Sequence, residues 1–160
     1  SLIDGKFYVL ASRIRRERLS SHISYMYELY NQYNPERMYY EDVTEQKENV
    51  TTLQEAFMYY EREFGYPLPL ERVRNTENKI ARIEATLSNL IENKKILFNY
   101  DDEDIKVLIE QLYEFPDGEA DDGVDALEMA VRKVLELMRR RIFLPTIRKV
   151  QKVSSILEGY

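Results

Sequence analysis

The sequence predicts an α/β fold, in which most helices pack on a sheet. Short strand-like runs alternate along the chain with longer segments whose apolar residues recur every three or four positions, and this alternation is typical of α/β layers. The chain has 160 residues, of which 44% are hydrophobic. That length allows one domain with a sizeable core and is too short for two comfortable ones.

The first part of the chain predicts strands on either side of one helix. An aromatic, β-branched run follows a turn-like Asp-Gly pair, which is typical of a strand, and the basic run after it is a candidate exposed strand. Apolar residues spaced by threes and fours then predict a helix that Ser20 or Ser21 caps and Asn34–Pro35 ends. The predicted elements are strands at Lys6–Ala11 and Arg13–Arg18, a helix up to Tyr33, and a strand at Arg37–Val43.

The rest of the chain alternates helices and strands more regularly. Each predicted helix carries one apolar stripe, and Gly65 closes the first of them as a helix-ending residue. The predicted elements are helices at Lys47–Phe64, after Thr76, at Asp101–Glu114 and at Asp122–Met138, with strands at Leu68–Val73 and Lys94–Phe98.

Composition restricts the chemistry that the chain can perform. It contains no Cys, which excludes disulfides, thiolate catalysis and thiolate zinc sites. The single His22 argues against a histidine metal cluster or a serine triad. Chemistry must therefore rest on carboxylates, Lys, Arg and hydroxyl groups. No apolar stretch approaches membrane-spanning length and the first residues do not form a signal peptide, so no membrane partner is expected.

Charge is distributed unevenly along this acidic chain. The net charge is −6, which argues weakly against a dedicated nucleic-acid coat protein. Arginines nevertheless cluster near the start, and no acid lies between Glu136 and Glu158, where we predict a basic C-terminal tail over residues 139–160. Such clusters are usually solvated surface, yet they also suit phosphates. The candidate phosphate contacts are Arg13, Arg15, Arg16, Arg18, Arg139, Arg140, Arg141, Arg148 and Lys149.

One stretch, FPDGEADDGVDALEMAV at residues 115–131, crowds five carboxylates into the approach to an apolar helix. Gly118 and Gly123 have the spacing of a phosphate-binding loop. However, Val124–Asp125 stands where that loop requires Lys followed by Ser or Thr, and the acids would repel phosphate. The sequence therefore rejects a nucleotide loop.

A calcium loop is a second possibility for the same stretch. Its oxygen positions 1, 3, 5 and 12 could be filled by Asp117, Glu119, Asp121 and Glu128. Its sixth position must be Gly for the sharp turn, and the residue at that position is Asp122. The calcium loop is therefore disfavoured.

Helix capping explains the position of the acids but not their number. Asp121 or Asp122 can accept the first free N–H groups of the helix, and one acid suffices for that. Asp121, Asp122 and Asp125 share one side of the first turn, so they repel one another unless a cation, an Arg or a Lys sits among them. Repulsion alone predicts that Asn at 121 or 125 raises thermal stability or leaves it unchanged when no metal is bound.

The same stretch resembles the closing motif of the nuclease domain of large terminase subunits from tailed bacteriophages. In that motif a Phe-Pro, a Gly, an Asp-Asp pair and an Asp-Ala-Leu open the last helix. The resemblance covers roughly Asp4–Met138 in one collinear order, which is more specific than any single motif. The upstream segments that carry it are DGKFYVLASRIRRERLS, NPERMYYEDV, YPLPLERV and NKIARIEATLSNLIENKKILF, the last with the family's Lys-x-x-Arg-Ile helix.

The resemblance implies an RNase H-like fold, a mixed central sheet flanked by helices, over a nuclease domain at residues 1–138. It also implies that carboxylates from separate segments bind two Mg²⁺ or Mn²⁺ ions, a role that oxygen ligands alone can fill. Glu41 is then one ligand, and Asp121, Asp122 and Asp125 supply the others in a division that the sequence leaves open. Taken alone, Glu41 is better explained as a solvated acid at a strand end.

The sequence departs from the family pattern at its start. The family carries its first catalytic Asp on a strand before the segment DGKFYVL, and this chain begins after that point, so we expect its fold to lack the first strand. Asp4 lies in the turn and does not match. The family's packaging ATPase domain is expected further upstream. The chain alone is therefore expected to cut DNA poorly or not at all.

The resemblance thus predicts the endonuclease portion of a viral DNA-packaging terminase, which cleaves concatemeric double-stranded DNA with Mg²⁺ or Mn²⁺. The expected partners are DNA, the terminase ATPase domain, the small terminase subunit and the portal, in the cytoplasm of an infected bacterial host. The alternative is a non-catalytic protein-interaction module of the same ancestry that binds no metal. The net charge of −6 favours that alternative.

Overall fold

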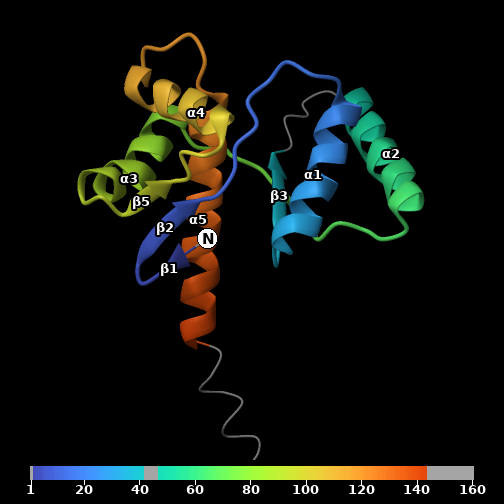
Figure 1. Ribbon diagram of the computed structural model, residues 1–160, viewed down its shortest axis with the longest axis horizontal. Helices are drawn as coiled ribbons and strands as arrows, with labels where there is room; N and C mark the ends of the chain where they lie inside the picture. The colour runs from blue at the N-terminus through green and yellow to red at the C-terminus, as the bar shows by residue number, and fades with distance from the viewer. Residues whose placement is uncertain (1, 42–46, 144–160) are drawn as a thin grey trace, which may run out of the picture. The chain divides into compact units, whose positions relative to one another are not determined.

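The computed structural model describes residues 2–41 and 47–143, which form a mixed α/β structure (Figure 1). The described residues divide into two compact units, each with its own hydrophobic core. The first contains the residues up to Ile14 and those from Asn78, and the second runs from Arg15 to Glu77. The sequence did not predict this division, because no Pro- or Gly-rich linker marks either of the two points at which the chain passes from one unit to the other.

The first unit contains a three-stranded sheet in the order β1-β2-β5. Strand β1 (Leu2–Ile3) pairs antiparallel with β2 (Lys6–Val9), and β2 pairs parallel with β5 (Ile96–Phe98). Asp4 and Gly5 join β1 to β2 with positive φ angles of 50° and 71°. An Asp-Gly pair suits such a hairpin turn, because both residues tolerate this backbone region better than most.

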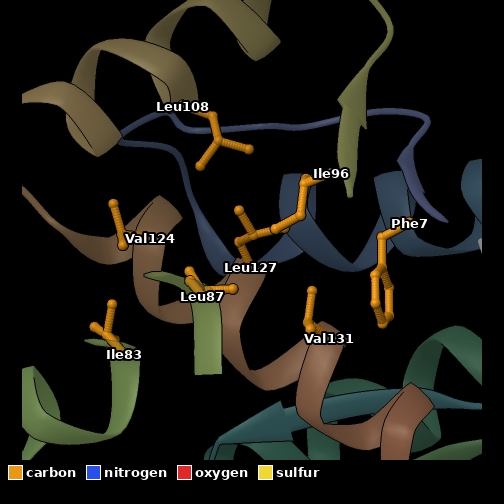
Figure 2. Close-up of a cluster of buried hydrophobic side chains, with 8 residues drawn as sticks. All are labelled: Phe7, Ile83, Leu87, Ile96, Leu108, Val124, Leu127 and Val131. Carbon is orange, nitrogen blue, oxygen red and sulfur yellow. The ribbon is translucent and has the colours of Figure 1, made fainter. Parts of the chain in front are cut away.

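Helices α3 (Lys79–Glu92), α4 (Glu103–Glu114) and α5 (Asp122–Phe143) complete the first unit. Their apolar stripes and the strands bury one common core, and Figure 2 shows its side chains converging from β2, β5 and all three helices. Burial of these aliphatic and aromatic groups is the main stabilising contribution to the unit. The core residues are Phe7, Ile83, Leu87, Ile96, Leu108, Val124, Leu127 and Val131.

The second unit pairs a small sheet with two helices. Its elements are α1 (Leu19–Tyr33), β3 (Met38–Glu41), α2 (Lys47–Phe64) and β4 (Leu70–Val73). Strands β3 and β4 are parallel, with α2 between them in the chain, and Glu41 lies opposite Val73. Tyr27 is 1% exposed and stacks on Phe64 at 4.2 Å between ring centroids. Its hydroxyl donates a hydrogen bond to the carbonyl of Tyr66. This bond satisfies the polar end of a tyrosine that is more deeply buried than tyrosines usually are.

Several boundaries differ from the sequence prediction by two or more residues, β1 was not predicted, and Ser20 and Ser21 lie inside α1 instead of capping it. The predicted strand at Arg13–Arg18 does not form, and α1 begins at Leu19, since the Arg18 carbonyl accepts the N–H groups of Ser21 and His22. A strand requires a partner for its backbone groups, and this segment has no strand pairing in the described part of the chain. Helix α5 continues past Met138 to Phe143.

Two further expectations lie partly outside the described residues. Of the predicted strand Arg37–Val43, the structure describes β3 up to Glu41. Of the predicted basic tail at 139–160, it describes the backbone as far as Phe143, so the boundary between domain and tail stays a prediction. Within the described residues, no helix is long and apolar enough to cross a membrane.

Candidate functional site

Asp121, Asp122 and Asp125 lie together at the start of α5, as the spacing predicted. The Asp125 N–H donates to the Asp121 carbonyl at 3.0 Å, which closes the first turn of the helix. The Asp122 side chain is exposed, while the side chains of Asp121 and Asp125 are 38% and 16% exposed. The first turn therefore presents a graded set of carboxylates, from solvent at Asp122 to the protein interior at Asp125.

A close contact with α4 fixes where this turn sits. The Gly123 N–H donates to the Gln111 side-chain oxygen at 2.9 Å in a buried hydrogen bond. A Cβ at position 123 would lie only 2.6 Å from that oxygen and 2.5 Å from Cδ1 of Ile14, so a larger residue would require both side chains to shift. Gly123 thus serves close packing, and a Gln rather than an Asp accepts this free N–H group at the start of the helix.

Two bases from α3 sit among the aspartates. Lys79 Nζ donates to Asp121 Oδ1 at 2.7 Å and lies 3.6 Å from Asp125 Oδ2. Arg82 Nη2 pairs with the other oxygen of Asp125. The three aspartates repel one another unless a positive group lies among them. The structure places a Lys and an Arg in that position.

These charges keep Lys79 protonated. Burial lowers the pKa of Lys79, but the hydrogen bond to Asp121 and the charges of Asp125, Asp121 and Asp122 together outweigh burial. The net result is a pKa above the ordinary value for Lys. At neutral pH the acid cluster, which consists of Asp121, Asp122 and Asp125, therefore contains a fixed positive charge.

The ion pairs between α3 and α5 form a network, and its deeper part surrounds Glu128, which is fully buried. Its carboxylate accepts from Arg82 Nε at 3.0 Å, from Thr86 Oγ1 at 3.0 Å and from Arg132 Nε at 2.7 Å. A buried carboxylate is tolerated only when it is paired and hydrogen-bonded, and this one has three donors. Glu128 is therefore structural, and the calcium loop, which would need it as a ligand, is wrong.

Glu41, the fourth predicted ligand, ends β3 in the second unit. It is half-buried, and Asn75 Nδ2 donates to its Oε1 at 2.8 Å. That hydrogen bond orients the carboxylate, which a solvated acid at a strand end would not require. Among the described residues, no group of three or more Asp, Glu or His side chains stands close enough together to hold a metal ion. The four-residue ligand set stays a prediction.

The basic clusters are exposed where the structure describes them. Arg15, Arg16 and Arg18 are exposed before α1, and Arg13 is half-buried. Arg139 and Arg140 are exposed near the end of α5. The predicted contacts that lie outside the described side chains are Arg141, Arg148 and Lys149.

Sequence reasoning gave no role to Lys79, Arg82, Asn75 or Gln111, and it considered Glu128 only as a ligand of the disfavoured calcium loop. A signal for three of them was present. Glu128 lies next to Leu127 on a stripe that is otherwise apolar, and an acid on a buried face requires a base. The Lys-x-x-Arg spacing of α3 matches the Asp-x-x-Glu spacing from 125 to 128, so two helices in contact can pair both charges at once.

Comparison with known proteins adds a family. The model of a family described as "Terminase RNaseH-like domain" matches residues 2–133 of the chain. The matched range contains Glu41 and all the residues of the ion network between α3 and α5. Searches of curated proteins and of solved structures found no match.

Proposed function

Because the chain belongs to the family of terminase RNase H-like domains, we propose that it is the metal-dependent endonuclease portion of a viral DNA-packaging terminase. Membership confirms the resemblance and the RNase H-like α/β fold class expected from the sequence. The observation that carries the proposal is the exposed edge of the acid cluster: Asp122 in the first turn of α5 is exposed, and the side chain of Asp121 just before the helix is 38% exposed. The proposed substrate of this endonuclease is concatemeric double-stranded DNA.

The proposed ligands fit divalent metal ions by their chemistry. Glu41, Asp121, Asp122 and Asp125 offer only carboxylate oxygens, which Mg²⁺ and Mn²⁺ prefer. Two ions, when bound, would activate water and stabilise the oxygens of a phosphodiester displacement.

Neighbouring side chains fix the orientation of two of these carboxylates. Arg82 holds one oxygen of Asp125, and the other oxygen lies 3.6 Å from Lys79 Nζ. Asn75 holds one oxygen of Glu41. Fixing a carboxylate in this way reduces the reorganisation that metal binding requires.

Cleavage of supercoiled plasmid in the presence of Mn²⁺ tests the proposal. The chain should be compared with a longer chain that carries the family's preceding strand, since we expect the longer chain to be the more active. Activity should be lost in Asp122→Asn and in Glu41→Ala. Glu103→Gln is the matched control, because Glu103 is an exposed acid in the first turn of α4 that pairs with Lys106. Equal loss in the control would refute a specific role for the cluster.

DNA contact is tested by salt dependence. Each phosphate neutralised by a base contributes about −0.9 to the slope of log affinity against log salt. Replacing the exposed Arg139 and Arg140 by Gln should therefore flatten the slope by roughly 1.8. An unchanged slope would place the DNA contact elsewhere. The ATPase domain, the small terminase subunit and the portal are the proposed protein partners in the cytoplasm of the infected bacterial host.

A second candidate function is a non-catalytic interaction module. The observation that favours it is the ion pairing of the cluster, since Lys79 and Arg82 already neutralise charge at Asp121 and Asp125. Calorimetric titration with Mn²⁺ separates the two. Heat that disappears in Asp122→Asn supports the nuclease, while the absence of any heat at millimolar Mn²⁺ supports the module.

A further inference from the structure

Lys79 occupies a position that is unfavourable for a cation. It is the first residue of α3, where the partial positive charge of the helix N-terminus repels an ammonium group. The first turn of α3 contains no acid that could compensate. Compensation comes from α5, where Asp121 Oδ1 lies 2.7 Å and Asp125 Oδ2 lies 3.6 Å from Nζ. The acid cluster therefore holds Lys79 where it is.

The ion network has an inner part and an outer part that differ in exposure. In the inner part, the side chains of Arg82 and Glu128 are 6% and 0% exposed. In the outer part, those of Lys79 and Asp121 are both 38% exposed. Exposed pairs contribute little to stability, whereas a buried pair is costly to break. The outer part can therefore open while the inner part keeps α3 against α5.

We infer that Lys79 is a built-in cation of the acid cluster and that a divalent ion must displace it from Asp121 in order to bind there. The inference rests on the proposed function and adds a regulation to it. The ammonium group uses an Asp121 oxygen that a metal would need, and a divalent ion bound to that oxygen would lie beside a fixed positive charge. Lys79 thereby raises the concentration of free metal at which the site fills.

Calorimetric titration of the 160-residue chain with Mn²⁺ tests this. Lys79→Met removes the charge but keeps an unbranched side chain, and it should bind Mn²⁺ about tenfold more tightly, equivalent to about 1.4 kcal/mol. Lys79→Arg retains the charge and should bind like the wild type. Lys106→Met is the matched control, because it removes one positive charge from an exposed pair with Glu103 on α4.

A measurement on the wild-type protein avoids any dependence on the folding of a variant. Displacement breaks the contacts of the Lys79 amine with Asp121 and Asp125 and exposes the amine to the reagent. Acetylation of Lys79, followed by mass spectrometry, should therefore become several-fold faster when Mn²⁺ is added. Lys106 serves as the internal reference, and its rate should not change.

The outcomes distinguish the inference from the proposed function. Tighter binding by Lys79→Met alone, with faster acetylation of Lys79 in Mn²⁺, supports displacement. Equal binding by the wild type and Lys79→Met, with unchanged acetylation, overturns displacement and leaves the metal site standing. If none of the four chains binds Mn²⁺, the proposed metal site is itself wrong, and displacement falls with it.

Discussion

Arg82→Met tests whether the buried ion network holds α3 against α5. Arg82 joins Asp125 and the fully buried Glu128, and its own side chain is 6% exposed. The substitution leaves Glu128 with only Thr86 and Arg132 as donors. Removing one partner of a buried pair costs about 3–5 kcal/mol. Because two donors remain, we expect the lower end, about 3 kcal/mol of unfolding free energy.

Thermal and urea unfolding, followed by circular dichroism, measure this loss. A domain of this size loses about 2–4 °C in Tm for each kcal/mol, so Tm should fall by roughly 6–12 °C. Arg139→Met is the control, because it removes an exposed arginine from α5. Its effect should stay within about 0.5 kcal/mol.

A double variant separates ion pairing from packing. In Arg82→Met combined with Glu128→Met, no buried carboxylate is left short of a partner, so the two losses should not add. We expect the double variant to be about 2 kcal/mol more stable than the sum of the single losses predicts. A loss below about 1 kcal/mol for Arg82→Met, a value typical of exposed pairs, would refute the reasoning, and so would simple additivity.

Three further predictions concern the same region. Asp125→Asn should lower stability by about 1–2 kcal/mol in urea unfolding, because its bond to Arg82 weakens; repulsion alone predicts the opposite sign, and no loss would favour it. Gly123→Ala should cost about 1–3 kcal/mol despite the higher helix propensity of Ala, because a Cβ would clash with Gln111, and a gain would disprove that contact. The pKa of Lys79 is raised, since its carboxylate partners outweigh burial, so its stabilisation is complete below about pH 10.4 and lost as pH rises through the folded-state pKa. From neutral pH upward, the Tm difference between wild type and Lys79→Met should therefore shrink only above that pH, and shrinkage near neutral pH would contradict the pairing.

The sequence alone determined the features that depend on near neighbours. Helix α2 has the predicted bounds, Lys47–Phe64, because its apolar spacing and the closing Gly65 act within a few residues. The placement of Asp121, Asp122 and Asp125 on one helical turn follows from the period of the α-helix in the same way. The order of motifs also predicted the family, which the match over residues 2–133 confirms.

Tertiary structure alone decided what surrounds those aspartates. Lys79 and Asp121 are 42 positions apart in the chain, and Arg82 and Glu128 are 46 apart. No local period relates such pairs, and they meet only because the core of the first unit packs α3 against α5. Charge repulsion can be read from the sequence because it acts within one turn, whereas its neutralisation depends on which helix the packing of apolar side chains brings alongside.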